Sequence, residues 1–317
     1  MMQGVGALLA IAALGLATAA AAASAPLWVY ALSLAAFGLP HVLTELRYVD
    51  ERFTLRTTAR VRRGLVLLLL AIVGVRLAGL AGVGTTPARI GFELGLGVVL
   101  VLWPLQQCGT RALAPGLLLA AALAFGTATA PATTMVLFAL LHNLTPIGLL
   151  AERLRGRDRR RALLGCVVVF VLVPLAMLLL PPPAVLHGPL GTGELDQHLA
   201  VFVPGRLHGG EAGDRLFAIA AWWQCVHYAI VLHVLPRLGG GAEGHAWPRP
   251  RAFARGVLVV GAVMALAFAS GFGTARAAYG VLAAVHAWIE LPVLVLAAGA
   301  GFASPRALRS SVHSPAA

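Results

Sequence analysis

Histidine and glutamate stand four residues apart in two apolar stretches of this 317-residue chain. The segment "HVLTE" carries His41 and Glu45, and the segment "HAWIE" repeats the spacing with His286 and Glu290. On a helix, residues four apart share one face, with their Cβ atoms about 6 Å apart. Two such helices in a bundle would direct imidazole nitrogens and carboxylate oxygens into a common interior. This set of ligands favours non-haem iron, with manganese or zinc as alternatives.

Two further apolar segments carry histidines. In "LLHNLTP", His142 precedes Pro146, which lacks an N–H group and interrupts a helix. In "WWQCVHYAIVLHVLPR", Gln224 and His227 share a helical face, whereas His233 is turned away from His227 by about 120°. Ionisable groups are costly inside a bilayer and therefore indicate function. The predicted metal ligands are His41, His142, His227, His233 and His286, and the predicted catalytic carboxylates are Glu45 and Glu290.

Simpler roles remain open for several of these residues. An isolated histidine within a membrane often serves as a hydrogen-bonded packing residue. Glu45 would have no catalytic role if it paired with Arg47 or Arg52 in the charged segment that follows it. Glu93 lies near the outer end of its helix, where Arg76 is expected to snorkel or to pair with it.

The substrate-lining residues are predicted from the same segments. Trp222 and Trp223 lie within an apolar run, where indoles either pack in the core or line a flat apolar substrate. The depth of the histidines along their helices predicts a polar cavity near the cytoplasmic side, opening inward. The predicted lining is Trp222, Trp223, Gln224, Asn143 and Tyr228.

The composition predicts the fold class. Hydrophobic residues make up 59% of the chain and charged residues only 11%, with a mean hydropathy of +0.87, whereas soluble domains carry about 25% charged residues. Apolar runs reach the ~20 residues that cross a bilayer. We predict an all-α polytopic membrane protein, with one domain over 1–303 and a disordered cytoplasmic tail over 304–317. The expected helices are 4–23, 27–46, 63–83, 90–107, 113–130, 133–152, 162–181, 215–236, 254–272 and 278–300.

The arginines predict the orientation. They cluster after even-numbered helices of this set of ten, which places every cluster on one side of the membrane, the cytoplasm. Both termini would then be cytoplasmic, in a bacterial inner membrane.

The net charge of +12 reflects these loops and not nucleic-acid binding, since no basic face with stacking aromatic residues is present. The first helix is favoured over a cleaved signal peptide because it lacks a basic start.

One long connection, about 182–214, is predicted on the outer side. It is polar, which is typical of a functional or disordered loop. Its histidines, His187, His198 and His208, are expected to be solvated rather than to bind a metal. The cysteines Cys108, Cys166 and Cys225 form no paired motif and read as small packing residues.

The segment "FGLPHVLTEL" resembles the glycine–X–proline–histidine motif of the Brp/Blh family of membrane β-carotene dioxygenases. "WWQCVHYAIVLHVLPR" is similar to a late helix of that family that supplies two histidines, and "LLHNLTP" would match its middle histidine segment. The resemblance implies that His41, His142 and His227 are iron ligands, with His233 a weaker match. The chain departs from the family at Val42, where the family has glycine, in its six-residue histidine spacing, and in having His286 and Glu290.

Three functions follow as hypotheses. The first is a membrane-embedded metal-dependent oxidoreductase of oxygenase or desaturase type, which acts on a lipid or isoprenoid such as a carotenoid. The second is a proton-coupled transporter, since intramembrane histidine and glutamate form proton relays and Pro40, Pro146 and Pro292 would break helices. The third is a haem protein in which His142 and His227 clamp the iron.

Overall fold

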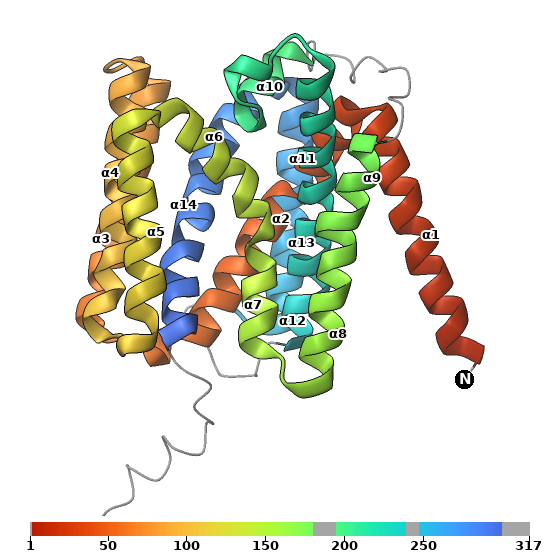
Figure 1. Cartoon of the computed structure of the whole chain (residues 1–317), viewed down its shortest axis with the longest axis horizontal. Helices are drawn as coiled ribbons and strands as arrows, with labels where there is room; N and C mark the ends of the chain where they lie inside the picture. Colours follow the sequence, from red (N-terminus) through yellow and green to blue (C-terminus); the bar gives the residue numbers. More distant parts are fainter. Residues whose placement is uncertain (1, 180–194, 239–246, 300–317) are drawn as a thin grey trace, which may run out of the picture.

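The computed structural model describes residues 2–179, 195–238 and 247–299, and every regular element in these ranges is helical. Figure 1 shows the helices standing side by side in one bundle, with α3, α4 and α5 grouped at one flank and α1 at the other. The predicted all-α architecture is therefore confirmed. The predicted tail, 304–317, lies outside the described residues.

The helices and short helical turns follow the apolar runs and their breaks. In chain order they are α1 (Met2–Ser24), α2 (Pro26–Phe53), η1 (Thr54–Arg56), α3 (Ala59–Leu80), α4 (Thr86–Leu102), η2 (Trp103–Gln107), α5 (Thr110–Thr129), α6 (Pro131–Leu141), η3 (His142–Leu144), α7 (Thr145–Arg153), α8 (Gly156–Val167), η4 (Val168–Leu172), α9 (Val173–Leu179), α10 (Asp196–Phe202), η5 (Gly205–Leu207), α11 (Glu211–Ala229), η6 (Ile230–Val234), α12 (Leu235–Leu238), α13 (Pro250–Ser270) and α14 (Phe272–Gly299).

Nine helical units within the described residues are long and apolar enough to cross a membrane, which supports an integral membrane protein. They correspond to the second through tenth predicted helices. Three of them are interrupted units: α6–η3–α7, α8–η4–α9 and α11–η6–α12. The first predicted helix lies within α1, of which Ala13–Ser24 is an apolar segment.

Arginine-rich segments meet at one end of the bundle. Arg52 at the end of α2 donates to both carboxylate oxygens of Glu152 in α7, at 2.6 and 3.3 Å. Arg153 donates to the carbonyl of Leu238, the last residue of α12. Three helices that were predicted to end on the same side therefore do end together, opposite α10 (Figure 1).

The described part of the predicted outer loop is folded against the opposite end of the bundle. Helix α10 lies there, and its His198 is only 3% exposed. The ring of His198 contacts those of Tyr30 and Phe272, and Arg276 lies 2.9 Å from His198 Nδ1. The expectation of a solvated histidine is thus wrong for His198, because aromatic side chains of α2 and α14 cover it. His187 lies outside the described residues.

Trp288 fixes how α14 packs against α4 and α6. Its indole is fully buried, stacks on Phe138 at 4.1 Å between ring centroids, and donates to Glu93 at 2.8 Å. Gly97 of α4 leaves room for the ring, since a Cβ there would lie 2.2 Å from Trp288 Cζ3.

We expect Gly97→Ala to destabilise the bundle by about 1–3 kcal/mol, because a methyl group would overpack this contact. The apparent thermal unfolding midpoint in detergent measures the effect. Gly74→Ala in α3 is the matched control, since a Cβ there meets nothing within 4 Å. Equal midpoints for the two variants would contradict the packing described for Trp288.

Candidate metal centre

Four histidines from four helical units meet near the middle of their spans. They are His41 of α2, His142 of η3, His227 of α11 and His286 of α14. One ligand atom from each lies within 4.8 Å of the others. His41 Nε2 and His286 Nε2 are 3.0 Å apart, and the ring centroids of His142 and His227 are 4.8 Å apart. The structure thus brings together four of the five predicted histidine ligands.

Both predicted glutamates lie in the same cluster, one helical turn beyond their histidines. Glu290 is fully buried, and its carboxylate lies 2.5 Å from His142 Nδ1. Glu45 is also fully buried and lies 3.5 Å from His227 Nε2. The alternative pairing of Glu45 with arginine is wrong, because Arg47 pairs with Glu51 and Arg52 with Glu152. The four-residue spacing therefore points each carboxylate inward, as predicted.

A break in the α6–η3–α7 unit presents His142. Pro146 cannot donate a backbone hydrogen bond, and the chain forms a 3₁₀ turn over His142–Leu144. The backbone N–H of Thr145 donates to the carbonyl of His142, three residues earlier. The Thr145 hydroxyl lies 2.7 Å both from the carbonyl oxygen of His142 and from Oε1 of Glu290. One interruption thus positions both an imidazole and a hydrogen-bond donor for the carboxylate.

His41 is held by contacts that leave one ring nitrogen free. Its Nδ1 lies 3.2 Å from the carbonyl oxygen of Phe37, one turn earlier. A neutral imidazole that donates there keeps a lone pair on Nε2, which faces His286. Tyr228 stacks on the His41 ring at 4.0 Å between centroids. Ligating histidines are typically oriented by such hydrogen bonds from the second nitrogen.

Several buried polar atoms of the cluster have no hydrogen-bond partner among the described residues. They are both carboxylate oxygens of Glu45 and both ring nitrogens of His227. Burying an ionised group without compensation costs several kcal/mol, so native structures pair such groups or coordinate them to metals. A cation between Glu45 and His227 would satisfy the carboxylate and the ring nitrogen that faces it. The donor set of imidazole and carboxylate fits a transition metal such as iron, manganese or zinc.

Glu93 and Arg76 form a second buried network beside the cluster. Their side chains are 2.7 Å apart, and Glu93 also accepts from Trp288. The predicted pairing of Arg76 with Glu93 is therefore confirmed. Trp288 lies two residues from both His286 and Glu290, so this network holds α14 in the rotation that points those ligands inward.

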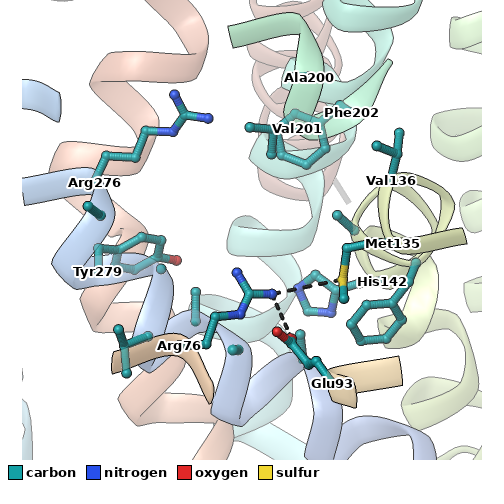
Figure 2. A pocket seen from close by; sticks show the side chains of 18 of the residues that line it. Arg76, Glu93, Met135, Val136, His142, Ala200, Val201, Phe202, Arg276 and Tyr279 are labelled. Carbon is teal, nitrogen blue, oxygen red and sulfur yellow. Dashed lines mark hydrogen bonds and ion pairs between the residues drawn. The ribbon is translucent and has the colours of Figure 1, made fainter. Parts of the chain in front are cut away.

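A cavity of about 640 Å³ reaches the histidines. His41, His142 and His286 line one end of it, and apolar side chains form most of its walls. Figure 2 shows Tyr279 and Arg276 on one wall, Met135 and Val136 on the opposite wall, and α10 closing one side.

The direction of this cavity corrects the prediction of an opening on the arginine-rich side. Its walls include α10 residues and Arg89 in the first turn of α4, which lie toward the other end of the bundle. Helices α2 and α14 are each 28 residues long, and His41 and His286 lie near the middle of both. The centre is therefore close to mid-span, and the cavity extends from it toward α10.

The predicted lining residues divide into two groups. Asn143, Gln224 and Tyr228 line the cavity. Trp222 and Trp223 do not, because their indoles point to the α8–η4–α9 unit and donate to the carbonyls of Val169 and Phe170, at 2.7 and 3.2 Å. Those carbonyls belong to a π-helical segment, Val168–Leu172. The tryptophans are therefore packing residues that hold α11 against η4.

Trp222→Phe is expected to destabilise the protein by about 1 kcal/mol, because it removes the indole N–H that donates to the partly buried Val169 carbonyl. Metal content should stay unchanged, since Trp222 does not line the cavity. Thermal unfolding and elemental analysis of the same sample measure both effects. A loss of metal with unchanged stability would show that Trp222 acts on the centre.

His233 does not join the cluster. Its side chain is exposed in the π-helical segment Ile230–Val234, which begins directly after the turn that carries His227. Three residues that support or line the site were not among those predicted: Trp288, Arg276 and Tyr279. The only sequence signal for Trp288 is its place within "HAWIE".

The chain was compared with protein-family models, with characterised proteins and with solved structures, and no match was found in any of the three comparisons.

Proposed function

We propose that the chain is a membrane-embedded, metal-dependent oxidoreductase of oxygenase or desaturase type that acts on a lipid or isoprenoid such as a carotenoid. The observation that carries this proposal is the cavity of about 640 Å³, which is largely apolar and ends at His41, His142 and His286. An apolar chain in this space would lie against the candidate metal ligands.

Iron is the proposed metal, with manganese or zinc as alternatives. The ligands would be His41, His142, His227 and His286, together with Glu45 and Glu290. A bound iron would supply the redox chemistry for oxidation by dioxygen. The protein's own residues orient the ligands: the Phe37 carbonyl lies against His41 Nδ1, and the Thr145 hydroxyl lies against Glu290.

Residues of the cavity would place and protect the substrate. Phe138 and Tyr279 provide apolar and aromatic surface, and Gln224 and Asn143 provide polar groups along the wall. Arg76 and Arg276 line the same space, which favours a substrate with a polar or anionic end. The resemblance to the Brp/Blh family makes β-carotene one substrate to test, and the two arginines make an acyl lipid with a polar or anionic end the other.

A proton-coupled transporter is the second candidate, and the contact between His142 and Glu290 favours it. The two groups lie 2.5 Å apart near mid-span, as members of a proton relay would. Proton-driven counterflow in liposomes that Glu290→Gln abolishes would support transport over catalysis. A haem is disfavoured, because four imidazoles and two carboxylates converge there, and the rings of His142 and His227, 4.8 Å apart between centroids, leave no gap for a porphyrin.

The test is turnover by purified, iron-loaded protein in lipid nanodiscs, with β-carotene and a monounsaturated fatty-acyl lipid as substrates. Ala139→Phe narrows the cavity and should lower turnover by more than tenfold while leaving the metal bound. Leu137→Phe is the control, because Leu137 is exposed on the same helix. No oxidised product from either substrate, despite bound iron, would contradict the proposed activity.

A further inference from the structure

The six candidate ligands form two overlapping groups rather than one. His41, His142, His227 and His286 form the first, and Glu45, His227 and Glu290 form the second. Within each group the ligand atoms lie within 4.8 Å of one another. His227 is the residue common to both.

The geometry of metal coordination limits how many of these atoms one ion can reach. Metal–ligand bonds of about 2.1 Å place opposite ligands of an octahedral ion about 4.2 Å apart. All ligands of one ion must therefore lie within about that distance of one another. Each group approaches this limit by itself, but the six residues do not form a single group of that size.

The second group contains buried polar atoms that have no hydrogen-bond partner among the described residues. Both oxygens of Glu45 are buried without a hydrogen-bond partner among the described residues, and the nearest imidazole nitrogen, His227 Nε2, lies 3.5 Å from the carboxylate. A single ion at His41 and His286 would leave those oxygens unsatisfied. Both ring nitrogens of His227 are likewise without a partner, so each nitrogen is available to a ligand on its own side of the ring.

We propose that the centre holds two transition-metal ions, one among His41, His142 and His286, and one among Glu45, Glu290 and His227. This proposal rests on the metal-dependent function proposed above and specifies its nuclearity. Adjacent ions about 3.5–4 Å apart are a known arrangement in metalloenzymes. The first ion would have an imidazole environment and the second a carboxylate-rich one, so the two would differ in affinity for a given metal.

Manganese(II) loading of the full-length protein tests this proposal. Elemental analysis should find two manganese ions per chain, and electron paramagnetic resonance should show an exchange-coupled pair. Glu45→Gln should reduce the content to one ion per chain with an uncoupled six-line signal. Glu51→Gln should retain two coupled ions, because Glu51 lies on the same helix and pairs with Arg47 outside the cluster.

The wild-type measurement is decisive even if Glu45→Gln does not fold. One uncoupled manganese per chain in active wild-type protein would overturn the two-ion centre while leaving the metal-dependent function standing. Loss of all manganese in a folded Glu45→Gln variant would also overturn it. No manganese, iron or zinc in the wild type would instead remove the proposed function itself, so the two failures are distinguishable.

Discussion

Replacement of His227 by alanine is expected to reduce the amount of bound metal and to lower turnover by more than about 100-fold. His227 is fully buried and belongs to both groups of candidate ligands, so no neighbouring histidine replaces it. Loss of residues that only orient a ligand already costs about 10–100-fold in metal affinity or activity, and loss of a ligand costs more. Elemental analysis and product formation by the same preparation measure the effect.

His233→Ala is the control for this prediction. It makes the same chemical change six residues further along the same helical unit, at an exposed position outside the cluster. We expect wild-type metal content and turnover for this variant. A folded His227→Ala protein with full metal content, or a His233→Ala protein without metal, would show that the centre lies elsewhere.

Glu93→Leu is expected to destabilise the protein by about 3 kcal/mol. The substitution removes the carboxylate that accepts hydrogen bonds from both Arg76 and Trp288, so two donors lose their acceptor inside the bundle. Breaking a buried ion pair costs about 3–5 kcal/mol, and the lower end applies because the Arg76 side chain is 36% exposed. The apparent unfolding midpoint in detergent measures the loss.

A double variant separates the charge from the packing. Arg76→Met combined with Glu93→Leu removes both charges, and we expect it to recover the part of the lost stability that comes from the unpaired Arg76, while Trp288 stays without its acceptor. Metal content should follow stability, because Trp288 holds the helix segment that carries His286 and Glu290. Additive losses in the double variant would contradict a direct pairing of Arg76 with Glu93.

Much of the site could be predicted because it depends on local helix geometry. His41 with Glu45, and His286 with Glu290, share a helical face in any α-helix, so their common orientation follows from spacing alone. Pro146 marked the interruption that presents His142. The cost of burying such residues in a bilayer made each of them conspicuous against a composition with only 11% charged residues.

Other features depend on contacts between distant segments, which spacing does not contain. Trp222 bonds to a carbonyl 53 residues away that a π-helical segment presents, and no pattern near Trp222 indicates that segment. Trp288 donates to Glu93, 195 residues earlier. The direction of the cavity depends on α10, a short helix in a polar connection that hydropathy does not place over the bundle. His233 lies outside the cluster because its side chain faces outward from η6.

The most direct test of the metal centre is elemental analysis of wild-type protein purified in detergent after growth with added iron, manganese and zinc. We expect at least one transition-metal ion per chain that remains after gel filtration, and a lower metal content in His227→Ala. Metal-free wild-type protein under all three conditions would contradict it, and the buried histidines and glutamates would then be assigned to proton transfer.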